Sequence, residues 1–87
     1  MAQFDVIIDN MAFNPASVTI ATGDTVKWTN KMAMAHTATA DNDEFDSGNI
    51  KPNGGTFTHT FPTSHPSGSV PYHCEIHPFM TGTVAVT

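Results

Sequence analysis

DTVKWTN, residues 24–30, alternates polar and apolar side chains and places Val26 and Trp28 on the same face. Alternation with a period of two, in β-branched and aromatic residues, is typical of a strand buried on one face. Gly23, directly before Asp24, favours a tight turn. The stretch therefore predicts a strand that follows a turn and packs Val26 and Trp28 against a core.

Six other segments share this short, β-branched or aromatic composition. They are DVIID (5–9), SVTIA (17–21), HTATA (36–40), GTFTHTF (55–61), SVPYHC (69–74) and GTVAVT (82–87). Turn-forming residues separate them, and no stretch keeps a helical period over three turns. Seven short strands at this spacing predict an antiparallel sandwich or barrel. The core is expected to contain Val18, Ile20, Val26, Trp28, Phe57 and Phe61.

The composition bounds the possible functions. The chain has 87 residues, so we expect a single domain spanning residues 1–87. No apolar run approaches the roughly 20 residues needed to cross a bilayer. Cys74 is the only cysteine, which excludes an internal disulfide. The net charge is −5 and the only lysines and arginines are Lys27, Lys31 and Lys51, which argues against nucleic acid as a partner.

The segment YHCEIHPFM, residues 72–80, brings Cys74, His77 and Met80 within seven residues. Thiolate, imidazole and thioether are soft or borderline ligands, and this set suits copper cycling between Cu(I) and Cu(II). Zinc accepts cysteine and histidine but rarely methionine, and paired cysteines are missing. A lone cysteine or methionine is more often a core residue, so the combination carries the prediction. A Cys/His hydrolase is a weaker interpretation, because nothing indicates an oxyanion hole.

This loop reaches a metal from one side only, so a second imidazole must come from another segment. His36 is the best candidate, because it ends the apolar run Met32–Ala35, which could wall off a dry site. His73 neighbours Cys74 on a predicted strand and is expected to point to the opposite face. His65 lies in a Pro/Ser/Gly segment and is predicted to be exposed, whereas His59 is predicted to be partly buried.

The acidic segment DNDEFD, residues 41–46, invites comparison with a calcium loop. An EF-hand beginning at Asp41 requires glycine at its sixth position and glutamate at its twelfth, where this chain has Asp46 and Pro52. The segment therefore predicts a solvated acidic loop, which could steer a cationic partner.

GDTVKWTNKMAMAH (23–36) and YHCEIHPFMTGTVAVT (72–87) together resemble the cupredoxins, the small blue-copper family that includes plastocyanin, pseudoazurin and amicyanin. The short loop with HPFM is most similar to that of amicyanin. The resemblance implies a Greek-key β-sandwich of about seven to eight strands and one type 1 copper ion. It also implies equatorial ligands His36, Cys74 and His77, with Met80 as the weak axial ligand. Thr37 stands where many cupredoxins have an asparagine that ties the two ligand segments together, so the surroundings of the site are expected to be altered.

The resemblance implies a small one-electron carrier that cycles between Cu(I) and Cu(II), rather than an enzyme. Two alternatives remain open: an open copper site acting on a small molecule such as a nitrogen oxide, and a copper transport or storage protein. Redox partners are expected to dock at an apolar patch near His77, formed by Met32, Met34, Pro78 and Phe79. We expect a monomer in the periplasm or another extracytoplasmic compartment, although the sequence shows no signal peptide.

Overall fold

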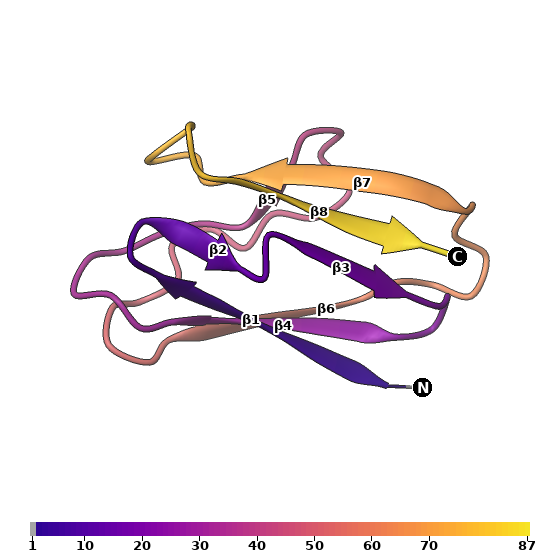
Figure 1. The fold of residues 1–87 in the computed structure, drawn as a ribbon, viewed down its shortest axis with the longest axis horizontal. Helices are drawn as coiled ribbons and strands as arrows, with labels where there is room; N and C mark the ends of the chain where they lie inside the picture. Colours follow the sequence, from indigo (N-terminus) through magenta and orange to yellow (C-terminus); the bar gives the residue numbers. More distant parts are fainter. Residues whose placement is uncertain (1) are drawn as a thin grey trace.

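In the computed structural model the chain forms a sandwich of two β-sheets (Figure 1). The structure describes residues 2–87, and the regular elements in this range are all strands. Their bounds are β1 (Gln3–Asp9), β2 (Ala12–Asn14), β3 (Ser17–Ile20), β4 (Thr25–Asn30), β5 (Thr39–Ala40), β6 (Thr56–Thr60), β7 (Gly68–His73) and β8 (Thr81–Val86). The prediction of an all-β sandwich with seven to eight strands is confirmed.

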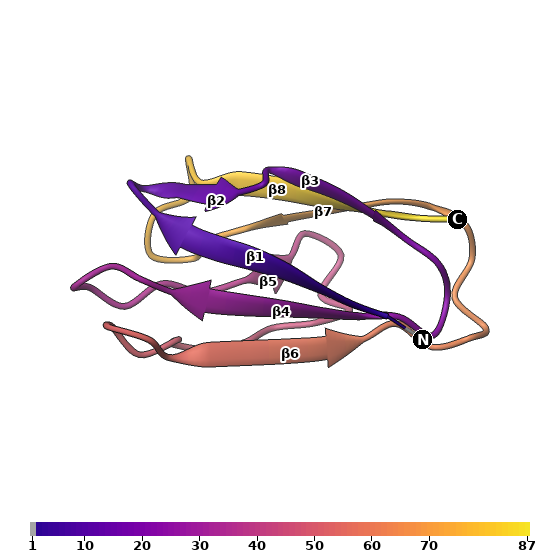
Figure 2. The same cartoon turned by 60° about the horizontal axis from the view of Figure 1, so that its bottom comes forward.

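Each sheet contains both parallel and antiparallel neighbours, so the expectation of a purely antiparallel sandwich is wrong. The strand order is β2-β1-β4-β6 in one sheet and β3-β8-β7-β5 in the other. β1 runs parallel to β4, and β3 runs parallel to β8. After the β1–β2 hairpin the chain crosses to the other sheet as β3 and returns as β4 beside β1 (Figure 2). This crossover makes β1 and β4 run in the same direction.

The core lies between the two sheets and is centred on aromatic rings. Trp28 is fully buried, and its ring lies 5.3 Å from Phe45 and 5.4 Å from Tyr72. Phe57, which was expected in the core, is only partly buried and packs against it from β6. The other buried apolar residues include Val6, Ile8, Phe13, Val18, Ile20, Val26, Phe61, Val70, Val84 and Val86. Burial of this apolar area is the main stabilising contribution to the fold.

Two segments differ from the predicted strands. Within 36–40, only Thr39 and Ala40 form a strand, β5. The preceding residues pair instead with a later loop, through an isolated bridge between His36 and Ile50. β2 has three residues, too few for alternation to reveal it in the sequence.

The segments that carry the predicted ligands meet at one end of the sandwich. The loop after β4 and the loop between β7 and β8 lie together at the end opposite the labelled C-terminus (Figure 1). The connection from β6 to β7, residues 61–67, lies at the other end of the sandwich. Residues 2–87 contain no helix long and apolar enough to cross a membrane.

Candidate metal centre

Asn30 holds the loop that leads to His36. Its buried side-chain amide donates to the carbonyls of Met34 and Ile50, at 2.8 Å and 3.1 Å. Its side-chain oxygen accepts a hydrogen bond from the Met32 amide at 2.9 Å. One buried side chain thus satisfies three backbone groups that no strand pairs, which gives residues 31–35 a fixed path.

His36 is fully buried at the end of this loop. Its backbone pairs with Ile50, whose amide donates to the His36 carbonyl at 2.7 Å. Burial lowers the pKa of His36, and the neighbouring His77 lowers it further. The neutral imidazole is therefore favoured, and this form can donate a lone pair to a metal.

The second ligand-bearing segment, residues 74–80, closes on itself through its main chain. The Cys74 amide donates to the Met80 carbonyl at 3.1 Å, and the Met80 amide donates to the His77 carbonyl at 2.9 Å. Cys74 and Met80 are buried, whereas His77 is partly exposed. Because β7 and β8 are antiparallel neighbours, the sheet fixes both ends of this loop.

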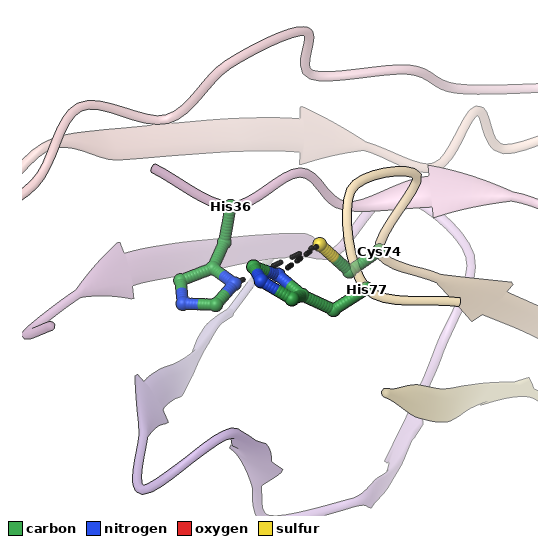
Figure 3. Close-up of side chains that lie close together, drawn as sticks. All are labelled: His36, Cys74 and His77. Atoms are coloured by element: carbon green, nitrogen blue, oxygen red, sulfur yellow. Dashed lines mark hydrogen bonds between the residues drawn. The ribbon is translucent and has the colours of Figure 1, made fainter. Parts of the chain in front are cut away.

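The structure brings His36, Cys74 and His77 together. The Cys74 sulfur lies 3.7 Å from His36 Nδ1 and 3.8 Å from His77 Nδ1. In Figure 3 the sulfur points toward the two imidazole rings, whose centroids are 4.9 Å apart. The three donor atoms all lie within 4.8 Å of one another. Three soft or borderline donors therefore converge, two of them buried.

These separations fit a metal bound in a trigonal plane. Typical bonds of about 2.3 Å to sulfur and about 2.0–2.1 Å to nitrogen, at an angle of about 120°, place the two donors about 3.8 Å apart. The observed 3.7 Å and 3.8 Å agree with this value. His36 Nε2, on the far side of its ring, has no hydrogen-bond partner among residues 2–87. The residues therefore fit a trigonal metal ion.

The family model of copper-binding proteins of the plastocyanin/azurin family matches residues 2–87. The chain belongs to this family. Copper is accordingly the cofactor of the site.

Individual relatives agree with the family. Plastocyanin of Scenedesmus fuscus is 33% identical over 88 residues, covering 87% of each chain. The reduced Cu(I) form of an amicyanin variant superposes with a TM-score of 0.83 at 30% identity, covering 97% of this chain and 81% of amicyanin. A novel purple cupredoxin from Nitrosopumilus maritimus gives a TM-score of 0.83 at 26% identity, covering 97% of this chain and 99% of that one.

In this cupredoxin Thr37 ties the two ligand segments together, although it offers no side-chain amide. Its backbone N–H donates to the Cys74 sulfur at 3.4 Å. Its hydroxyl oxygen accepts a hydrogen bond from the Glu75 amide at 2.8 Å. Thr37 was expected to alter the surroundings of the site, but it still links the two ligand segments, through its main chain and its hydroxyl.

The other histidines lie outside the donor set. His73 was predicted to face away from the site, and its two ring nitrogens contact Asp41 at 2.5 Å and Glu75 at 3.0 Å. The hydrogen bond with Asp41, followed by that with Glu75, raises the pKa of His73 despite its partial burial. His65 was predicted to be exposed, but its side chain is only 11% exposed, so that prediction is wrong.

The acidic segment is only partly the solvated loop that was predicted. Its first three residues, 41–43, are exposed, but Phe45 is buried and packs against Trp28. Glu44 contacts His65 Nε2 at 2.7 Å, which explains why His65 is covered. A phenylalanine between acidic residues is the sequence signal for this inward turn.

The residues that the sequence reasoning missed are those that position the ligands. Asn30 and the Thr37 hydroxyl act through buried hydrogen bonds to segments distant in the sequence. The only signal for Asn30 is a polar residue at the inward phase of an alternating strand, two positions after Trp28. No local pattern marks Ile50, whose backbone pairs with His36.

Proposed function

We propose that this protein is a type 1 copper protein that carries single electrons between redox partners. His36, Cys74 and His77 serve as the equatorial ligands and Met80 as the weak axial ligand. The observation that carries the proposal is the convergence of the Cys74 sulfur and two imidazole nitrogens at 3.7 Å and 3.8 Å. The family match and the likeness to amicyanin in its Cu(I) form support copper as the metal.

Bound copper supplies a one-electron change of oxidation state at the centre of these donors. The chain supplies a frame that keeps the same donor positions in both states, which makes the exchange fast because little reorganisation is needed. Asn30 fixes the His36 loop, and the Cys74–Met80 hydrogen bond closes the other loop. The Thr37 N–H donates to the thiolate and helps to set the reduction potential.

Electrons leave through His77, the one equatorial ligand that is partly exposed. Phe79 is 71% exposed, and its ring lies 6.2 Å from that of His77. Met34 is 44% exposed, and Pro78 is also exposed. These three residues form an apolar docking surface for redox partners, of the small kind that permits rapid release.

Two residues change the composition of this docking surface. Met32 was expected to belong to it, but it is partly buried and its sulfur accepts a hydrogen bond from the Met11 amide at 3.3 Å. Ile76, in the same loop as His77, is 47% exposed and adds apolar area to the loop. The protein acts as a monomer with this surface free, in the periplasm or another extracytoplasmic compartment.

Burial of the ligands favours a carrier over an open catalytic copper. Met80 is 2% exposed and His36 is fully buried, so a small substrate in solvent has little access to either side chain. A storage protein needs the same donors but no useful potential. Voltammetry of the copper-loaded protein distinguishes a carrier from a storage protein, because only a carrier is expected to give a reversible response.

The test of the proposal is copper titration followed by visible and electron-paramagnetic-resonance spectra. We expect one-to-one uptake of Cu(II) and an intense visible band from thiolate-to-copper charge transfer. Cys74→Ser should abolish this band, because it removes the thiolate. His59→Gln, which changes a histidine outside the donor set, is the matched control and should retain it. A band that survives in Cys74→Ser would remove Cys74 from the site.

A further inference from the structure

A chain of hydroxyl groups leads from the metal centre to the surface. The Glu75 amide donates to Thr37 Oγ1 at 2.8 Å, and Thr37 Oγ1 lies 3.1 Å from Thr39 Oγ1. Thr39 Oγ1 in turn donates to the Asp46 carboxylate at 3.0 Å. Thr37 and Thr39 are buried, whereas Asp46 is exposed. This series of hydrogen bonds thus begins at Glu75, one residue after Cys74, and ends at the exposed carboxylate of Asp46.

The direction of these hydrogen bonds follows from the chemistry of their ends. A carboxylate only accepts, so the Thr39 proton is committed to Asp46. The Thr39 oxygen is then free to accept from Thr37, whose own oxygen accepts from the Glu75 amide. All O–H dipoles therefore point their positive ends toward Asp46 and their negative ends toward the metal centre. Hydrogen bonds aligned in this way polarise and strengthen one another.

Hydrogen bonds of the neighbouring backbone hold this row of hydroxyl groups in place. The Ala38 amide donates to Ser47 Oγ at 2.8 Å, and the Ser47 amide donates to the Ala38 carbonyl at 3.1 Å. Asp46 also accepts from the Gly48 amide at 3.0 Å, which fixes its carboxylate. Because the Glu75 amide is committed to Thr37, the Cys74 sulfur accepts a single backbone amide, that of Thr37, among residues 2–87.

We propose that Thr37, Thr39 and Asp46 form a directed hydrogen-bond relay that positions the Glu75 amide beside Cys74 and lowers the reduction potential of the copper site. Thr39 and Asp46 are positioning residues, since they act through Thr37 and touch no ligand. Negative charge and the negative ends of dipoles stabilise the more positive Cu(II), which lowers the potential. This inference rests on the proposed copper function and identifies a residue at the surface that tunes it.

The test combines amide hydrogen exchange with voltammetry. Thr39→Val breaks the relay without changing charge, and we expect roughly three- to tenfold faster exchange of the Glu75 amide, as expected when one hydrogen bond is weakened. We also expect an upward shift of the reduction potential. Thr39→Ser retains the hydroxyl and should restore both values. Exchange is measured on the copper-free protein as well, so it tests the relay even if the proposed copper function fails.

A pair of charge variants separates the relay from simple electrostatics. Asp46→Asn and Asp43→Asn each remove one charge from the same loop, and Asp43 is exposed. We expect Asp46→Asn to speed exchange of the Glu75 amide and to give the larger upward shift of potential, because only Asp46 ends the relay. Asp43→Asn should leave the exchange rate at its wild-type value, and an unchanged rate in Asp46→Asn would contradict the relay. Equal shifts in the two variants, or wild-type exchange and potential in Thr39→Val, would overturn the proposal. A Thr39→Val protein that fails to fold leaves the Asp46 and Asp43 comparison as the deciding measurement.

Discussion

The two ligand-bearing segments are held in different ways. Residues 31–36 follow a path set by the buried side chain of Asn30 and by pairing with Ile50, which belongs to a separate loop. Residues 74–80 are closed by hydrogen bonds within the loop itself, between two strands that are antiparallel neighbours. The first segment depends on distant parts of the chain, whereas the second is largely a local unit.

This difference predicts where the site is vulnerable. A change in a buried polar group leaves its former partners without hydrogen bonds, and each such group costs about 1–3 kcal/mol. A change of similar size in an apolar side chain of the local loop costs less, because packing can adjust. The His36 side of the site should therefore be the more sensitive one, and four measurements test this comparison.

The largest effect is expected for Asn30→Ala. The substitution leaves the Met34 carbonyl and the Met32 amide without their side-chain partner, and it leaves the Ile50 carbonyl with only the longer hydrogen bond from the His36 amide. We therefore expect a loss of roughly 2–4 kcal/mol in the free energy of unfolding. Denaturant unfolding of the copper-free protein measures it. Asn49→Ala, at an exposed position, is the control and should stay within about 0.5 kcal/mol. Similar losses in both variants would remove the special role of Asn30.

Gly82→Ala tests the sheet that carries the second loop. Gly82 lies opposite Tyr72 in the β7–β8 pair, and an added Cβ would come within 2.4 Å of the buried tyrosine ring. We expect a loss of about 1–3 kcal/mol from this overpacking. A thermal unfolding series with Tyr72→Leu and the double variant checks the cause, since two residues in contact should not act additively. An additive result would mean that the ring is not responsible.

Met80→Leu changes the local loop with little change of volume. We expect the free energy of unfolding to fall by less than about 1.5 kcal/mol. Copper should still bind, and the reduction potential should shift upward, because the thioether no longer donates electron density to Cu(II). Voltammetry and the visible spectrum provide the readout. An unchanged potential and spectrum would show that Met80 is not an axial ligand.

The smallest effect is expected from the clamp between His65 and Glu44, which fastens the loop that braces the His36 segment. Hydrogen bonds to the Pro66 carbonyl and to Glu44 raise the pKa of His65 despite burial. The contribution of His65 to the free energy of unfolding is therefore complete below its pKa in the unfolded chain, about 6.5. It is lost as pH rises through the higher pKa of the folded protein. Burial acts to raise the pKa of Glu44, but hydrogen bonds from Asn42 and His65 outweigh it and lower the pKa. The contribution of Glu44 to the free energy of unfolding is thus present above about pH 4.5, its pKa in the unfolded chain. It is lost as pH falls through the lower pKa of the folded protein.

Thermal unfolding as a function of pH tests the clamp. Between about pH 6 and pH 8 we expect the free energy of unfolding to fall more in the wild type than in His65→Gln, by less than about 1 kcal/mol. The variant keeps the part of the pH dependence that comes from His73, whose pKa is also raised. His59→Gln is an informative control, because burial lowers the pKa of His59 and gives it the opposite pH dependence. A pH profile that is the same in wild type and His65→Gln would contradict the clamp.

The sequence predicted the regular strands well and their surroundings poorly. Alternation in residues 24–30 correctly placed Val26 and Trp28 in the core. It failed for residues 36–40, because that segment is buried throughout and is paired largely by bridges, so no alternation appears. Phe45 was missed because the acidic residues around it indicated solvent exposure. The parallel pairs escaped prediction because they depend on which sheet each strand joins.

The amino-acid order alone determined the local features: short strands, turns between them, and a cysteine, a histidine and a methionine placed within one tight loop. These follow from interactions over a few residues, which a linear pattern contains. Only the tertiary structure decided how His36 reaches that loop and which groups hold it there. Its position depends on hydrogen bonds from Asn30 and Ile50 and on the link from Thr37 to Glu75, contacts that exist only once the two sheets have packed.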